Sequence, residues 1–159
     1  MSPATMRVTL RLRTALGLPH SETLFADHAG PGRFRLLSNS YFAPMAVGDI
    51  VRVVEGREGL IIAGLAEAGP MAVSVIVIDR QVSLDDVKSI ADSWRARGAS
   101  WSEEAFGILT TVWQPHLPAD DVFDLLVSNL RGRPGWSTPT VYAPEDRTNE
   151  LLRRVAHVG

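Results

Sequence analysis

Strand patterns alone occupy the first 68 residues, and this constrains the fold more than any other feature of the chain. In residues 6–14, apolar side chains alternate strictly with arginine or threonine, which places Val8, Leu10 and Leu12 on one face. Such alternation predicts a half-buried β-strand. Four more strand patterns follow, at residues 23–28, 33–38, 49–56 and 60–68. Five short strands with no helical pattern predict a small barrel or a strongly bent sheet.

The pattern changes near Gly69–Pro70. The elements expected from there are a strand, a helix, a hairpin, a second helix and a last strand, at residues 72–79, 83–98, 99–115, 117–132 and 135–143. Ser83 is the expected N-cap of the first helix. The hairpin is expected to turn near Glu103–Glu104, and Pro139 places the last strand at a sheet edge. The β-α-β-β-α-β order is that of a ferredoxin-like fold.

The sequence therefore predicts an α+β fold: a small β-barrel-like N-terminal unit packed on a ferredoxin-like unit, with a C-terminal helix. The expected boundaries are 1–69 for the β-rich part, 70–144 for the ferredoxin-like part and 145–159 for the helix. In that helix Leu151, Leu152 and Val155 are expected to face inward.

Composition excludes several classes of protein. The 159 residues include no cysteine, which rules out disulfides, thiol catalysis and thiolate metal sites. No apolar run approaches the ~18–20 residues that cross a bilayer, and we expect a cytoplasmic protein. The net charge of −2 is unevenly divided, with +3 in residues 1–54 and −5 in residues 55–159. A basic first third and an acidic remainder suggest two units.

Four short motifs carry a resemblance to a known family. They read ETLFA, GRFRL, NSYFA and GDIV, at Glu22–Ala26, Gly32–Leu36, Asn39–Ala43 and Gly48–Val51. In this order and spacing, residues 7–142 resemble the bacterial domain of unknown function 4265. The chain departs from the family pattern at Ser40, where that pattern has proline. The resemblance implies a ferredoxin-like tail and a bacterial origin, and it implies no activity.

The stretch around the third and fourth motifs contains the first candidate site. Tyr41 and Phe42 would stack on a ligand, or they would plug the end of a barrel. Asp49 follows Gly48 just before an apolar strand. This pair favours a structural turn, because glycine permits a positive φ and aspartate bonds to nearby backbone. A functional Asp49 is the alternative.

Arginines form the second candidate, a basic face on the predicted β-surface. Its members are Arg7, Arg11, Arg13, Arg33, Arg35 and Arg52. Such a stripe would meet nucleic acid or an acidic protein. The alternative is a solvated outer sheet face whose charges discourage edge pairing. Because the sequence pI of about 6.1 is not that of a basic protein, nucleic acid is the weaker prediction.

Catalytic and metal-binding patterns are not recognisable. The four histidines, including His28, have no metal-ligand spacing. The acidic pairs Asp85–Asp86 and Asp120–Asp121 suit the first turn of a helix, where the helix dipole favours negative charge. We therefore predict no metal, no cofactor and no defined catalytic residue, and we lean against an enzyme.

The functional prediction is a non-enzymatic binding or accessory protein that acts through protein–protein contact, such as an immunity or regulatory protein. One alternative is a small-molecule binding protein or small enzyme that uses the cleft between the two parts. The residues of that cleft would be His28, Tyr41, Phe42, Asp49 and Trp113. The third hypothesis is weak nucleic-acid binding on the arginine face.

Overall fold

The chain leaves its first unit after Gly69 and returns to it at Pro144. In this computed structural model the described residues are 5–12 and 19–147. The first unit comprises Met1–Gly69 and Pro144–Gly159, and the second comprises Pro70–Ala143. The boundary at Gly69 coincides with the predicted one, whereas the last segment groups with the first unit. The predicted α+β fold class is confirmed.

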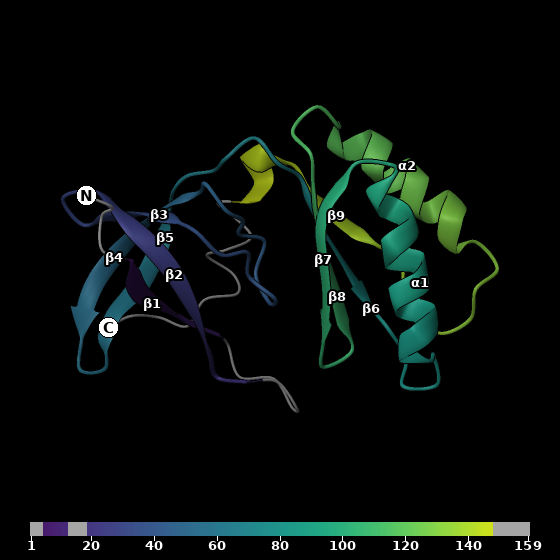
Figure 1. Cartoon of the computed structure of the whole chain (residues 1–159), viewed down its shortest axis with the longest axis horizontal. Coiled ribbons are helices and arrows are strands. Elements are labelled where there is room, and N and C mark those ends of the chain that lie inside the picture. The colour runs from purple at the N-terminus through teal and green to yellow at the C-terminus, as the bar shows by residue number, and fades with distance from the viewer. Residues whose placement is uncertain (1–4, 13–18, 148–159) are drawn as a thin grey trace. The chain divides into compact units, whose positions relative to one another are not determined.

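The first unit contains five strands, each antiparallel to the next along the chain (Figure 1). They are β1 (Met6–Arg11), β2 (Ser21–Gly30), β3 (Arg33–Leu36), β4 (Ile50–Gly56) and β5 (Gly59–Glu67). They form a closed barrel in chain order. The closure between β1 and β5 is parallel, through Thr9 and Ile61, because a meander with an odd number of strands brings its first and last strands together in the same direction.

The interior of the barrel follows from strand alternation. Val8, Leu10 and Leu12 are all buried, as the pattern of residues 6–14 predicts. The other strands contribute the remaining core side chains, among them Leu24, Ala26, Phe34, Leu36, Val51, Val53, Ile62 and Leu65. The arginines and threonines between them point away from this core, since successive residues of a strand face opposite sides.

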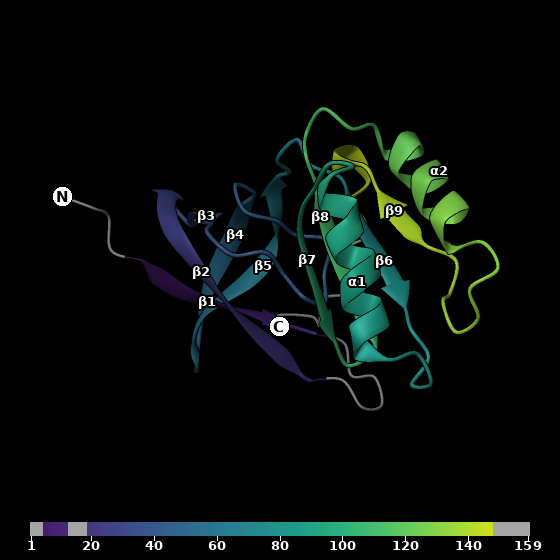
Figure 2. The same ribbon diagram turned by 45° about the vertical axis from the view of Figure 1, so that its right-hand side comes forward.

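The second unit is a four-stranded antiparallel sheet with two helices on one face (Figures 1 and 2). Its elements are β6 (Val73–Val77), α1 (Leu84–Arg95), β7 (Ala99–Ala105), β8 (Ile108–Trp113), α2 (Ala119–Leu130) and β9 (Thr140–Tyr142). The strand order is β7-β8-β6-β9, so β7 and β9 are the sheet edges. Pro139 directly precedes the edge strand β9, in agreement with the edge position predicted for it.

Local signals explain where these elements begin and turn. The Ser83 side chain accepts a hydrogen bond from the Asp86 N–H at 3.1 Å, so it is the N-cap of α1 as predicted. The predicted hairpin turn near Glu103–Glu104 is wrong. The chain turns at Phe106–Gly107, with φ values of 54° and 78°. Two positive φ values fit a two-residue type I′ turn, which keeps Glu103 and Glu104 inside β7.

A buried ion pair holds the returning segment to the barrel. Residues 144–147 form a helical turn. Both terminal nitrogens of Arg147 donate to the Asp49 carboxylate, and neither side chain has exposed surface. Arg147 also donates to the carbonyls of Pro44 (3.2 Å) and Gly69 (2.9 Å). Asp49 accepts the N–H groups of Ala46 and Gly69, both at 2.7 Å.

Residues 148–159, which include Leu151, Leu152 and Val155 of the predicted C-terminal helix, lie outside the described residues. Within the described part of the chain, no helix has the length and apolarity needed to cross a membrane.

We predict that Asp49→Ala destabilises the first unit by about 3–5 kcal/mol, because it leaves the Arg147 guanidinium buried without its counter-charge. Urea unfolding followed through NMR methyl signals of the barrel core is the measurement, since all four tryptophans lie in residues 70–143. Asp146→Ala is the matched control, because Asp146 neighbours Arg147 but is exposed. Equal stability of Asp49→Ala and Asp146→Ala would contradict the assigned role of the pair.

Candidate functional site

The segment that joins β3 to β4 contains the candidate residues Tyr41 and Phe42, and we call residues 37–48 the aromatic loop. Its two ends are tied together: the Gly48 N–H donates to the Leu36 carbonyl, and the Leu36 N–H donates to the Asp49 carbonyl. Across the loop the Ser40 N–H donates to the Met45 carbonyl, and the Val47 N–H donates to the Asn39 side chain at 2.8 Å. These bonds give the loop a defined backbone conformation.

Ser40 and Glu22 anchor the start of the loop. The Ser40 hydroxyl donates to Glu22 Oε2 at 2.6 Å and accepts the N–H groups of Phe42 and Ala43. The second carboxylate oxygen, Oε1, accepts the Tyr41 N–H at 2.7 Å. One carboxylate and one hydroxyl therefore satisfy three consecutive backbone N–H groups, and this fixes the direction in which the loop leaves β3.

Burial raises the pKa of the Glu22 carboxyl above its ordinary value of 4.5, while the bonds from Ser40 and from the Tyr41 N–H lower it. Burial is the larger effect, because a charged carboxylate loses favourable hydration when it leaves water. The burial of Glu22 at its position beneath the loop therefore destabilises the charged carboxylate relative to the protonated form.

The aromatic loop presents apolar side chains at the surface. Leu37 and Val47 are each 42% exposed, and Tyr41 is 37% exposed. We call Leu37, Tyr41 and Val47 the apolar patch. Phe42 is half-buried and packs against the barrel core, as the plug interpretation expects. Its ring lies 6.3 Å from that of Tyr41, with 43° between the planes.

Asp49 has a structural position. It has no exposed surface, and its two oxygens accept from Ala46, Gly69 and Arg147. The preceding residue, Gly48, has a φ of +94°, as the turn interpretation requires. A carboxylate with these bonds offers no surface to a ligand.

The other two residues of the predicted cleft lie in different surroundings. Trp113 is completely buried in the core of the second unit, and its indole N–H donates to the Ser74 hydroxyl at 2.9 Å. It therefore makes no ligand-accessible surface, which corrects its inclusion among the contact residues. His28 is exposed on β2 and meets the Phe34 ring edge-on at 5.4 Å.

The predicted basic face is divided between two places on the barrel. Arg33 and Arg52 are directly opposed on β3 and β4, and Arg35 follows on β3. Arg7 and Arg11 lie on β1, opposite Phe25 and Ser21 of β2. Because β2 separates β1 from β3, the arginines do not form one continuous stripe. Arg13 lies outside the described residues.

Sequence reasoning missed the residues that organise this region: Glu22, Ser40 and Arg147. Ser40 carried a signal, since a serine outside regular secondary structure often bonds to nearby backbone. Arg147 carried none, because its partner Asp49 is 98 residues away. Among the described residues, no group of three histidine or acidic side chains is placed to hold a metal ion.

Comparisons with known proteins give a fold and no function. No family model matches the chain, and no curated protein matches it. Among solved structures, the chain is similar to a hypothetical protein from Neisseria gonorrhoeae, with a TM-score of 0.58 and 15% identity. The match covers 91% of this chain and 95% of that one. The resemblance to the domain of unknown function 4265 stays a prediction.

The raised pKa of Glu22 predicts a pH dependence of stability. A raised pKa in the folded state means that Glu22 favours folding most below pH 4.5 and loses that contribution as the pH rises through its folded pKa. Glu22→Gln cannot titrate. The free energy of unfolding of the wild type minus that of the variant should therefore decrease as the pH rises through the folded pKa of Glu22. Urea unfolding at several pH values measures it, with Glu67→Gln at the exposed end of β5 as the control. A difference that increases with pH would contradict the assignment.

Proposed function

We propose that this protein is a non-enzymatic binding protein that acts through protein–protein contact, with the apolar patch of the aromatic loop as a contact surface. An immunity or regulatory role is the kind of activity such contact serves. The observation that carries the proposal is the combination of three exposed apolar side chains with a loop backbone held by internal hydrogen bonds.

Preorganisation supports this function. A loop that is ordered before it binds pays less conformational entropy at the moment of association. Interface centres are enriched in aromatic residues, and a few buried anchors supply most of the binding free energy. Tyr41, with Leu37 and Val47 on the same loop, has the composition of such an anchor group. Ser40 and Glu22 bond to the loop backbone at Tyr41 and the two residues after it.

Charge adds little to the choice of partner. Residues 70–143 contain six basic and nine acidic side chains, a net charge of −3, whereas the remainder of the chain carries +1. The contrast between the two units is thus smaller than the contrast between residues 1–54 and 55–159. Complementary charge of this size affects the rate of encounter more than the affinity.

The proposal includes a finer assignment of the fold. We assign the first unit to small β-barrels and the second to the ferredoxin-like class. Support for the latter comes from its element order and from its strand order β7-β8-β6-β9. Since folds of these classes serve many unrelated functions, this assignment does not select a partner.

Removal of the apolar patch tests the function. In a lysate of the source organism, the wild-type protein should retain one stoichiometric protein partner. The triple variant Leu37→Ser, Tyr41→Ser and Val47→Ser should lose it, since loss of an anchoring side chain costs about 2 kcal/mol or more. Retention is measured by affinity capture with quantitative mass spectrometry.

A matched control removes exposed apolar surface elsewhere. Val54 on β4 and Val77 on β6 are 40% and 57% exposed, and their replacement by serine should leave retention unchanged. Circular dichroism must show that all variants are folded. No retained protein, or equal retention by the triple variant, would refute the proposed contact surface.

A further inference from the structure

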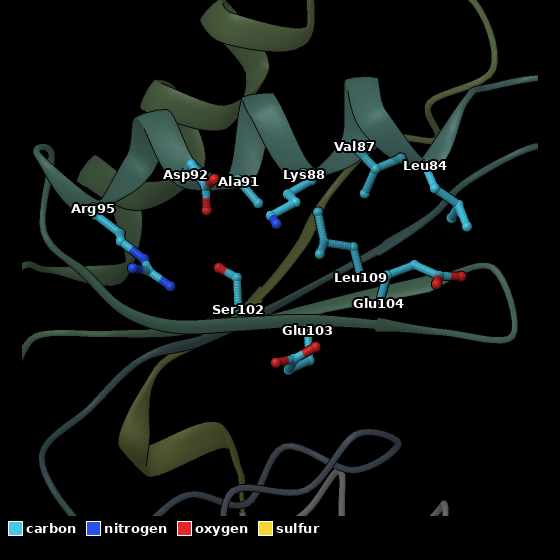
Figure 3. Close-up of a pocket in the computed structure, with 10 residues that line it drawn as sticks. All are labelled: Leu84, Val87, Lys88, Ala91, Asp92, Arg95, Ser102, Glu103, Glu104 and Leu109. Atoms are coloured by element: carbon cyan, nitrogen blue, oxygen red, sulfur yellow. The ribbon is translucent and has the colours of Figure 1, made fainter.

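A groove separates helix α1 from the edge strand β7 in the second unit (Figure 3). Its volume is about 390 Å³. Val87, Ala91 and Leu109 form its apolar floor, and each is buried. Leu84, which is 67% exposed, extends the apolar surface at one end. The groove lies within one unit, and it contains none of the residues of the aromatic loop.

The backbone of β7 provides one side of this groove. Within the described part of the chain, β7 pairs only with β8, so its outer edge carries backbone groups that no strand satisfies. The irregularity in β7 is confined to Ala99–Trp101, and Ser102 to Ala105 keep regular register with β8. An open strand edge beside a helix is the geometry in which extended peptides add a strand.

Two cations on α1 point into the groove. Lys88 and Arg95 both extend from the helix toward β7 (Figure 3). They are seven residues apart, which corresponds to roughly 10 Å along a helix. Among the described residues, neither forms an ion pair within 4.0 Å. The Ser102 hydroxyl points toward the helix from the opposite wall (Figure 3), and it donates to the Thr111 hydroxyl at 3.0 Å.

Acidic side chains limit where an anion would bind. Asp92 lies between Lys88 and Arg95 on the helix wall (Figure 3). Glu104 accepts the Gly107 N–H at 2.8 Å, and thus one of its oxygens is used within the hairpin. Glu103 also lines the groove, and its side chain points to the other side of β7 (Figure 3). The Arg95 end is therefore the more favourable end for a negative charge, because Glu104 lies toward the other end (Figure 3).

We propose that this groove binds an extended acidic peptide of a partner protein as an added strand on β7. A carboxylate of the peptide binds Arg95 or Lys88, and an apolar side chain lies against Leu84, Val87 and Leu109. Side chains on one face of a strand are two residues apart, about 6.6–6.8 Å. The residues of the peptide that face the groove therefore occupy every second position, and they alternate between acidic and apolar. This surface is independent of the aromatic loop.

The test uses a fluorescein-labelled octapeptide with the sequence Asp-Thr-Leu-Thr, repeated once, and fluorescence anisotropy with the full chain. Binding should saturate, and NMR shift changes should map to α1 and β7. A matched peptide with lysine in place of aspartate should bind about tenfold more weakly, since each lost surface ion pair costs up to about 1 kcal/mol.

Three variants distinguish this mode from unspecific binding. Lys88→Ala with Arg95→Ala should weaken binding of the acidic peptide about tenfold, and Asp92→Asn should strengthen it about twofold because it removes a repulsive charge. Arg97→Ala, beyond the end of α1, should have no effect. The proposal is overturned if the acidic peptide does not saturate by about 1 mM, if the lysine peptide binds equally well, or if the NMR changes lie outside α1 and β7. A loss of binding in the triple variant of the aromatic loop is not expected, so the two proposals fail separately.

Discussion

The buried pair Asp49–Arg147 is the interaction on which the first unit depends. Desolvation of two charges is expensive, and it is offset only when geometry is good and the remaining polar atoms are satisfied. Here the carboxylate accepts from two backbone N–H groups as well as from Arg147, and the terminal nitrogens of the guanidinium donate to two carbonyls. Among the described residues, the Arg147 Nε is the one polar side-chain atom of the pair that has no hydrogen-bond partner. These bonds join the aromatic loop, the end of the barrel at Gly69 and the segment that returns after the second unit.

The second unit is inserted into the first, and the network of Asp49 and Arg147 includes the residue at which the chain leaves the first unit. Gly69 is the last residue before that unit, and both its N–H and its carbonyl belong to the network of Asp49 and Arg147. The same network fixes Pro44 and Ala46 within the aromatic loop. Stability of the barrel and conformation of the proposed contact loop are therefore coupled through one charge pair, in addition to the anchor made by Glu22 and Ser40.

Much of this fold follows from local sequence, and the rest depends on distant partners. Alternation in residues 6–14 identifies the buried face of β1, and Ser83 identifies the start of α1, because both signals act over a few residues. The turn at Phe106–Gly107 was missed, since phenylalanine is an unusual residue at a positive φ, whereas two adjacent glutamates look like a polar turn. Trp113 was misplaced because both faces of β8 are buried, so alternation cannot separate core from surface. Arg147 has no local signal at all.

Hydrogen exchange tests the central role of the pair most directly. The Ala46 and Gly69 N–H groups lie in different segments but donate to the same carboxylate. In native-state exchange followed by NMR, both should exchange as slowly as the barrel strands, and both should become fast in Arg147→Met, because groups that open together share one free energy of opening. If they exchange in the wild-type protein as fast as the exposed turn at Arg57–Glu58, the pair does not hold these segments together.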